Sequence, residues 1–378
     1  MGSLSSMSLA VVLQQRFFDC ILEVSPEQTR FGVKRAQQGV FDAKDKRTLL
    51  AVEQQAAQSR QAGAAAKQQF LEFTQAHLHD QVAEELFLKL SKFETVANTV
   101  FSLAEGFPAV LDALSARAVT LSQLENLISP VEWLKEDLIK LANQPQYRKK
   151  AATSYVKELK VALGMFGLES LKQIIPLFAF RRCLPHSTDP FTQFKSNIWE
   201  YSMTVANAAK RLAEESGDNA FVAFCAGLFQ SLGYLVVTRT YLRTYAQVKQ
   251  AALLKARDAR DTVLTDALDS LDADASFLTS CFSEFSAFIS ADLVSKWQLK
   301  RMPLGQVLDQ LAEGISFQGA GPITKLLHQA DYFAQAQWLR KTRQLSETED
   351  LQWRQAVQLR ADYLAILQNS RLDKLSVE

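Results

Sequence analysis

Histidine, the side chain most often used to bind a catalytic metal or to move a proton, is scarce in this chain. The only histidines are His77, His79, His186 and His328. His79 and Asp80 form a pair whose imidazole and carboxylate could ligate a divalent metal. The pair lies in a polar, glutamine-rich segment, and His77, two residues earlier, points to a different side of a helix. We therefore interpret His77 and His79 as solvated side chains and not as a metal site.

A second pair has a spacing that suits chemistry better. His328 and Asp331 are three residues apart, so that on a helix the imidazole and the carboxylate share one face. Two side chains alone make an incomplete metal site, so we predict a satisfied structural pair at this position.

Nucleophiles and cofactor motifs are equally sparse. The four cysteines, Cys20, Cys183, Cys225 and Cys281, form no Cys-x-x-Cys motif, and apolar neighbours surround most of them. Free thiols in such surroundings serve as small core residues, so neither a disulfide framework nor a zinc ribbon is expected. No glycine-rich phosphate loop and no Gly-x-Ser-x-Gly sequence occurs. We expect no cofactor.

One basic cluster could contact phosphates or an acidic partner. Arg148, Lys149 and Lys150 follow Tyr147, which places an aromatic ring beside three cations. The whole chain has 42 Lys and Arg against 41 Asp and Glu, a formal net charge of +1. A nearly neutral chain has no bulk field that attracts nucleic acid, so we interpret the cluster as a contact to a partner or to phosphate.

The composition predicts helices to position these residues. Hydrophobic residues make up 48% of the 378, with only 14 Gly and 9 Pro, and no segment alternates apolar and polar residues between turn signals. We therefore predict an all-α protein. The longest apolar runs, Ile174 to Phe180 and Phe221 to Phe229, are shorter than the roughly 20 residues of a membrane span. With no leader peptide evident, the prediction is a cytoplasmic protein without membrane contact.

The helical pattern changes along the chain, which suggests three parts. Residues 1–90 are predicted to form a helical N-terminal arm, because the stretch from Asp42 to Gln81 is rich in Ala, Gln, Lys and Glu and can bury little by itself. Residues 91–305 form the predicted core, and residues 306–378 add C-terminal helices that pack on it. Among the predicted helices are Ser154 to Phe166, Leu168 to Phe180, Phe191 to Ser216, Ala220 to about Leu254, Pro322 to Gln344 and Thr348 to Ser370.

A series of short motifs runs through the predicted core in a fixed order. They are Phe107-Pro108-Ala109-Val110, Thr120 to Ile128 with Ser129-Pro130, Leu138 to Asn143, Val161 to Gly164, Ile198 to Ser202, Ala226 to Gly233 and Leu293 to Lys300. Over roughly 200 of the 378 residues this order resembles the HDOD family, the non-catalytic relatives of HD-domain metal-dependent phosphohydrolases. The resemblance implies an HD-like helical bundle, here with a helical N-terminal extension and additional C-terminal helices.

The departures from the hydrolase pattern decide what the resemblance implies about activity. Tyr201 stands where a hydrolase has its first histidine, and Gln230-Ser231 stands at its His-Asp pair. Neutral amide and hydroxyl groups are poor substitutes for imidazole and carboxylate as metal ligands. We therefore expect no enzyme activity and a vestigial pocket lined by Trp199, Tyr201, Gln230, Ser231 and Asp331.

The resemblance implies a bacterial regulatory module that acts on an unidentified signalling protein by direct contact. One alternative is a sensor that binds a small anionic ligand, such as a nucleotide, in the vestigial pocket without cleaving it. Another is that the N-terminal arm makes a homodimer or captures a partner helix.

Overall fold

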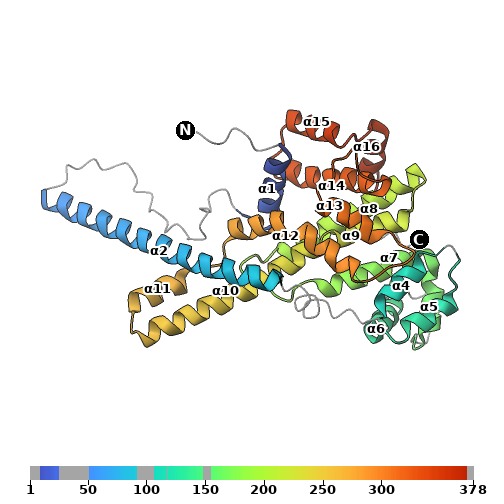
Figure 1. Cartoon of the computed structure of the whole chain (residues 1–378), viewed down its shortest axis with the longest axis horizontal. Helices are drawn as coiled ribbons and strands as arrows, with labels where there is room; N and C mark the ends of the chain where they lie inside the picture. The colour runs from blue at the N-terminus through green and yellow to red at the C-terminus, as the bar shows by residue number, and fades with distance from the viewer. Residues whose placement is uncertain (1–8, 25–50, 92–105, 117, 148–154, 373–378) are drawn as a thin grey trace. The chain divides into compact units, whose positions relative to one another are not determined.

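A computed structural model describes residues 9–24, 51–91, 106–116, 118–147 and 155–372. Every regular element in these ranges is a helix, which confirms the predicted all-α fold (Figure 1). The helices are α1 (Leu9–Ile21), α2 (Ala51–Ser91), α4 (Phe107–Leu114), α5 (Leu121–Ile128), α6 (Glu132–Ala142), α7 (Leu159–Cys183), α8 (Phe194–Ser216), α9 (Ala220–Phe229), α10 (Leu232–Asp258), α11 (Thr262–Ser270), α12 (Ala275–Ser295), α13 (Leu304–Ala312), α14 (Pro322–Lys341), α15 (Glu347–Ala356) and α16 (Ala361–Gln368).

The chain divides into two compact units. Unit 1 comprises Met1–Glu23, Ala97–Val237 and Cys281–Glu378, and unit 2 comprises Val24–Val96 and Thr238–Ser280. This division follows packing and does not test the domain boundaries at residues 90 and 305, which stay a prediction.

The centre of unit 1 is a hairpin of α8 and α9 against which α14 packs. Gly217 ends α8 in the left-handed conformation, with φ of 78°, and the Asn219 side chain then caps α9 by accepting hydrogen bonds from two of its first N–H groups. Gly227 lets the two helices approach closely, because a Cβ at this position would lie 2.7 Å from the Cα of Ala206. The hairpin therefore presents residues of α8 and α9 together to α14.

The helix predicted from Ala220 to about Leu254 is in fact two helices. α9 ends at Phe229, and α10 begins at Leu232 after a short break. The hydroxyl of Ser290, on α12, holds this break by donating a hydrogen bond to the Gln230 carbonyl (2.7 Å) and accepting one from the Gly233 N–H (2.8 Å). The apolar pattern continues through the break, so periodicity alone could not reveal it.

Residues with positive φ angles end helices at two other places in the chain. Gly167 has φ of 70° and separates the two halves of α7, as the predicted break between Phe166 and Leu168 requires. The helix predicted from Thr348 to Ser370 is wrong in its continuity, because Gln358 adopts φ of 49° and separates α15 from α16. A glutamine carries no sequence signal for a left-handed residue.

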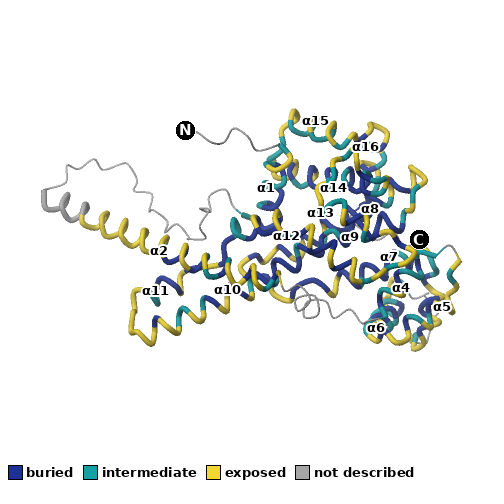
Figure 2. The backbone as a smooth tube through the Cα atoms, in the orientation of Figure 1, coloured by how far each residue is buried: buried dark blue, intermediate teal, exposed yellow. Residues whose placement is uncertain are grey.

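Of the predicted N-terminal arm, residues 1–23 belong to unit 1 and the rest, with α2, to unit 2. α2 packs against α11 and buries an apolar stripe of Leu78, Val82, Leu86 and Leu90. Residues 59–70 of the same helix are exposed, which is the long exposed stretch of α2 in Figure 2. The predicted polar stretch is therefore helical from residue 51 onward, and among its side chains described from residue 59 only those of the C-terminal part form a buried face.

The prediction of a plainly cytoplasmic protein without membrane-spanning helices is wrong. Three helical stretches, Leu159–Cys183, Ala220–Asp258 and Ala275–Ser295, are long and apolar enough to cross a membrane by length and composition. The prediction counted uninterrupted apolar runs, whereas these helices reach a high mean hydropathy with polar residues scattered among apolar ones. Of their most apolar windows, 56%, 83% and 56% respectively is buried inside the protein.

Candidate functional site

The centre of the candidate site is a hydrogen bond between Tyr201 on α8 and Asp331 on α14. The Tyr201 hydroxyl donates to Oδ1 of Asp331, and the Gln335 amide donates to Oδ2 (2.9 Å). Tyr201 is among the largest fully buried side chains of unit 1, with 1% of its surface exposed. Both carboxylate oxygens of Asp331 are thus engaged by neutral donors.

Burial controls the ionisation of this pair. Desolvation raises the pKa of Asp331, although the hydrogen bonds from Tyr201 and Gln335 and the nearby His328 oppose that rise. The pKa of Tyr201 lies well above its usual range, first because of burial and then because of the Asp331 charge. The phenol therefore stays protonated and serves as a hydrogen-bond donor.

Replacing Tyr201 by Phe is expected to destabilise the protein by about 1–3 kcal/mol at neutral pH, because Asp331 loses one of its two donors inside the fold. The lost bond favours the ionised carboxylate, so the pKa of Asp331 rises further in the variant. A carboxyl group whose pKa is higher in the folded than in the unfolded state destabilises the folded protein at pH values above its unfolded pKa. The loss of unfolding free energy in the variant should therefore shrink as the pH falls toward about 4, the unfolded pKa of an aspartate. Urea unfolding at several pH values measures this.

Tyr332→Phe is the matched control for that variant. The Tyr332 hydroxyl also donates to an aspartate, Asp350 (2.8 Å), but Asp350 keeps a bidentate contact to Arg340 (2.7 and 2.8 Å) and is partly exposed. The control should lose less than about 1 kcal/mol. Equal losses of unfolding free energy in the two variants would contradict the prediction, because the Tyr201–Asp331 bond would then contribute no more than the Tyr332–Asp350 bond.

Gln230 and Ser231 lie in the break after α9, a helix that packs on both α8 and α14. Ser231 has no exposed surface, and its hydroxyl is buried without a hydrogen-bond partner among the described residues. The Gln230 amide nitrogen is in the same situation. These two predicted residues are therefore inside the fold but contribute no hydrogen bond to the Tyr201–Asp331 pair.

Trp199 belongs to a different side of α8. It is two residues from Tyr201, which turns it away on a helix, and its ring packs against Phe180 with centroids 6.1 Å apart. It lines a shallow surface hollow with Leu184, Thr192 and Lys195. The structure thus brings together Tyr201 and Asp331 and separates Trp199 from them.

The N-terminal helix α1 covers the site, which the sequence did not indicate. The ring of Phe17 lies against Tyr201, with centroids 4.7 Å apart, and Phe18 packs edge-on against Tyr234 (5.6 Å) and Phe282 (5.4 Å). Phe17 has no exposed surface. The side-chain amide of Asn197, on α8, donates a buried hydrogen bond to the carbonyl of Ile21 at the end of α1 (2.9 Å). These contacts bury Tyr201 completely, whereas Asp331 stays partly accessible to solvent.

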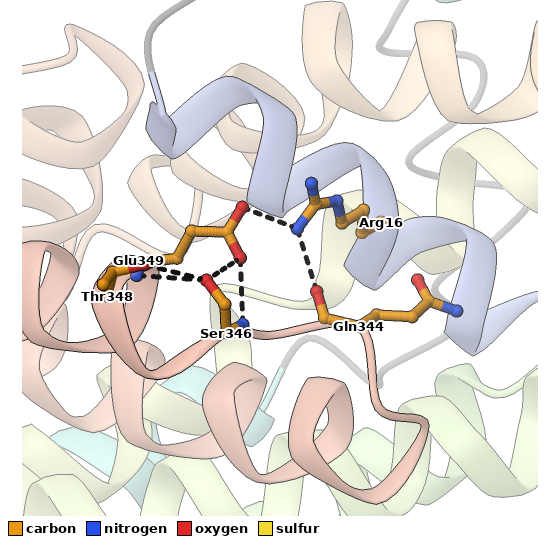
Figure 3. Close-up of polar contacts among 5 residues, drawn as sticks. All are labelled: Arg16, Gln344, Ser346, Thr348 and Glu349. Atoms are coloured by element: carbon orange, nitrogen blue, oxygen red, sulfur yellow. Dashed lines mark hydrogen bonds and ion pairs between the residues drawn. The ribbon is translucent and has the colours of Figure 1, made fainter.

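A polar contact between the two ends of the chain holds α1 in place (Figure 3). Arg16 donates hydrogen bonds to the Gln344 carbonyl (2.9 Å) and to Glu349 (3.0 Å). Glu349 also completes a capping box with Ser346 at the start of α15, and these bonds lower the pKa of its carboxyl. The Ser-x-x-Glu signature is visible in the sequence, but its second role as the acceptor for Arg16 is not.

The donors at this site do not suit a divalent transition metal. Asp331 has both oxygens in hydrogen bonds, Tyr201 is held neutral, and Gln230 and Ser231 offer only neutral groups. The described ranges contain no group of three or more His, Cys, Asp or Glu side chains that could hold a metal ion. We therefore assign no chemical step to a metal here.

The predicted satisfied pair of His328 and Asp331 is wrong. Asp331 bonds to Tyr201 and Gln335 instead, and Nε2 of His328 is buried without a hydrogen-bond partner in the described part of the chain. Tyr201, on α8, and Gln335, one turn later on α14, donate to this carboxylate in place of His328. The other predicted contact, Arg148, Lys149 and Lys150, lies outside the described residues.

The interpretation of His79 as solvated is also wrong. In unit 2 only 15% of its side chain is exposed, its ring stacks on Phe277 (5.5 Å), and its Nδ1 lies 3.9 Å from a carboxylate oxygen of Asp274. Burial lowers the pKa of His79, whereas the charges of Asp274 and Asp80 raise it by less. Its neighbours come from a segment about 200 residues later, which the local polar context could not reveal.

Acidification from about pH 7.5 to about 5.5 is expected to destabilise the wild type more than a His79→Gln variant. A histidine whose folded-state pKa is lowered contributes stability above its unfolded pKa of about 6.5 and loses it as the pH falls. The slopes of unfolding free energy against pH should differ between the two proteins by at most about 1.4 kcal/mol per pH unit, which corresponds to the uptake of one proton. Thermal unfolding of both proteins across this range measures it.

His328 is present in both proteins and cancels in that comparison, although burial lowers its pKa in the same direction. Burial raises the pKa of Asp274, so protonation of this carboxyl on acidification opposes the effect in both proteins. Parallel pH profiles for wild type and variant would contradict the prediction.

Comparisons with known proteins agree with the resemblance in the sequence. The family model described as "HDOD domain" matches residues 101–302. No curated protein matches the chain.

Among solved structures, two proteins from Shewanella amazonensis SB2B are similar. One, named a "putative metal-dependent phosphohydrolase", has 15% identity and a TM-score of 0.41, over 79% of this chain and 100% of that one. The other, named a "putative phosphohydrolase", has 19% identity and a TM-score of 0.44, over 73% and 91%. An HDOD domain protein with unknown function from Geobacter sulfurreducens has 16% identity and a TM-score of 0.40, over 76% and 100%.

Proposed function

Because this chain belongs to the HDOD family, we propose that it is a regulatory module of a bacterial signalling pathway, which acts by contact with another protein and does not hydrolyse phosphoesters. The partner is a signalling protein that remains to be identified.

The observation that carries the proposal is the buried Tyr201 side chain, whose hydroxyl is hydrogen-bonded to Asp331. A hydrolase of the HD type needs an open cavity with metal ligands, since the metal must reach both a water molecule and the phosphate. Here Tyr201 fills that position with a neutral, hydrogen-bonded side chain, and Phe17 covers it. A module of this kind can still present helical surfaces to a partner.

The same geometry speaks against the alternative of a small anionic ligand in the vestigial pocket. The side chain that accepts the Tyr201 hydrogen bond is an acid, Asp331, and burial lowers the pKa of the nearby His328, which favours its neutral form. A buried carboxyl group repels an anion and raises the cost of bringing one in. We therefore place contact with a protein ahead of nucleotide sensing at this site.

Elemental analysis of protein purified without chelator and without a histidine tag tests the proposal, together with hydrolysis of bis(p-nitrophenyl) phosphate. We expect substoichiometric transition metal and no turnover above buffer. Asp331→Asn is the matched variant, because it removes the only carboxylate of the site.

Stoichiometric metal and turnover in the wild type, both lost in Asp331→Asn, would overturn the proposal. Turnover that persists in Asp331→Asn would show a contaminating enzyme or a different site, and the assay would then be repeated after a second purification step.

The arm remains a second route to protein contact. Phe73 on α2 is 72% exposed, and the neighbouring Phe70 is 36% exposed on the same face. If the arm makes a homodimer, light scattering should give twice the chain mass for the wild type and the single mass for Phe73→Glu. Leu254→Glu, at a 54% exposed position of α10, is the control and should leave the mass unchanged. A single-chain mass for the wild type would leave only a different protein as the partner.

A further inference from the structure

A groove in unit 1, apart from the Tyr201–Asp331 pair, has the features of a binding site. The first turns of the second half of α7, the C-terminal half of α8, the start of α9 and the segment Ser370–Leu372 form its walls. Its volume is about 630 Å³, which is within the range of small-molecule sites. The Asn219 side chain already accepts hydrogen bonds from the first N–H groups of α9. The side chains of the walls are therefore the groups available to contact a ligand.

Cations outnumber acids along this groove. It is lined by Lys172, Lys210, Arg211 and Arg371 against two acids, Glu169 and Glu214. The two cations of α8 share one carboxylate, since Glu214 lies 3.6 Å from Nζ of Lys210 and 3.1 Å from Nη1 of Arg211. Lys172 pairs with the other acid, Glu169 (2.8 Å), whereas Arg371 forms no ion pair within the described ranges. The groove therefore has a net charge of +2 and cations that are only partly neutralised.

We call Phe221, Phe224 and Leu372 the floor of the groove, because these apolar lining residues are buried. Phe221 and Phe224, from the first turns of α9, are buried there. Leu372 is 7% exposed, and its carbonyl accepts a hydrogen bond from the Asn207 amide (2.8 Å), which fixes the segment that carries Arg371. An apolar floor beneath a rim of cations suits a ligand that combines an apolar or aromatic part with a multiply charged group.

We propose that this groove binds a phosphorylated small molecule of about nucleotide size. A phosphate has more charge and more acceptor oxygens than the single Glu214 carboxylate, so it can engage Arg211 and Arg371 while Glu214 keeps Lys210. The volume accommodates a ring system over the phenylalanine floor. This inference does not depend on the absence of hydrolysis at Tyr201–Asp331 and concerns a separate part of the surface.

Isothermal titration of the full chain with ATP and with pyrophosphate, both without divalent metal, tests the proposal. We expect saturable binding of at least one probe below about 1 mM. Arg211→Ala combined with Arg371→Ala should weaken it at least tenfold, because two charge-assisted contacts are lost. Binding of ATP alone would indicate that the apolar floor contributes, and equal binding of both probes that the phosphates suffice; either supports the site.

Two matched variants distinguish binding in this groove from binding elsewhere on the protein. Lys140→Ala removes an exposed cation that is also paired one helical turn away, with Glu136 on α6, and should bind like the wild type. Tyr201→Phe alters the vestigial site and should also leave binding unchanged.

The proposal is overturned if neither probe binds, if the double variant binds like the wild type, or if Lys140→Ala loses as much affinity as the double variant. A loss confined to Tyr201→Phe would likewise overturn it and move the ligand to the vestigial site. Circular dichroism of each variant confirms that a loss of binding is not a loss of fold.

Discussion

Gly233→Ala is expected to lower the free energy of unfolding by about 3 kcal/mol or more, or to prevent folding. A Cβ at this position would lie 1.9 Å from the backbone carbonyl oxygen of Ser286, and 2.5 Å from its carbonyl carbon. Extra atoms in a well-packed interior cost about 1–3 kcal/mol when side chains can adjust, and here the obstacle is backbone. Urea unfolding followed by circular dichroism measures the change, with soluble yield as the readout if the variant does not fold.

Two other glycines calibrate this result. Gly227→Ala meets the Cα of Ala206 at 2.7 Å and should be destabilising, but less so than Gly233→Ala. Gly164→Ala, on an exposed turn of α7 with no atom within 4 Å of the new Cβ, should stabilise the protein by about 0.5–1 kcal/mol through helix propensity alone. A Gly233 variant as stable as the wild type would mean that α10 and α12 are not in close contact.

Phe17→Ala should be the most damaging change in α1, with an expected loss of about 3–5 kcal/mol. The ring has no exposed surface and packs on Tyr201, so its removal leaves a cavity above the Tyr201–Asp331 pair. Thermal unfolding measures the loss of stability. If water enters the cavity, the pKa of Asp331 should also move back toward its ordinary value, because burial is the main cause of its rise.

Val11→Ala is the control on the same helix. Val11 is 45% exposed, and the substitution should change the stability by no more than about 0.5 kcal/mol. Similar effects of the two substitutions would show that α1 is not packed on the site in solution.

Local patterns in the sequence predicted much of the fold. The break at Gly167 follows from a residue that tolerates positive φ, and the start of α14 follows from Pro322 at the first helical position. The predicted helical N-terminal arm includes α1, whose buried residues Leu13 and Phe17 recur at helical spacing. The motifs of the core identified the family and the helix that carries Tyr201.

Features that depend on distant segments could not be predicted. Nothing near Phe17 indicates that its partner is Tyr201, and nothing near His79 indicates Asp274. Gly233 belongs to a recognised motif, but the reason for a glycine there is a helix that follows about 50 residues later. The left-handed conformation of Gln358, which separates α15 from α16, likewise could not be predicted, since glutamine has no preference for that conformation.

The bond between Arg16 and Glu349 has a consequence for the order of synthesis. These residues are 333 positions apart, so Arg16 is synthesised long before its acceptor Glu349. At about 5–20 residues per second, the interval between the two is on the order of tens of seconds. The aromatic partners of α1, such as Tyr201 and Phe282, are synthesised within this interval, so α1 can pack on them before the bond to Glu349 fixes its position.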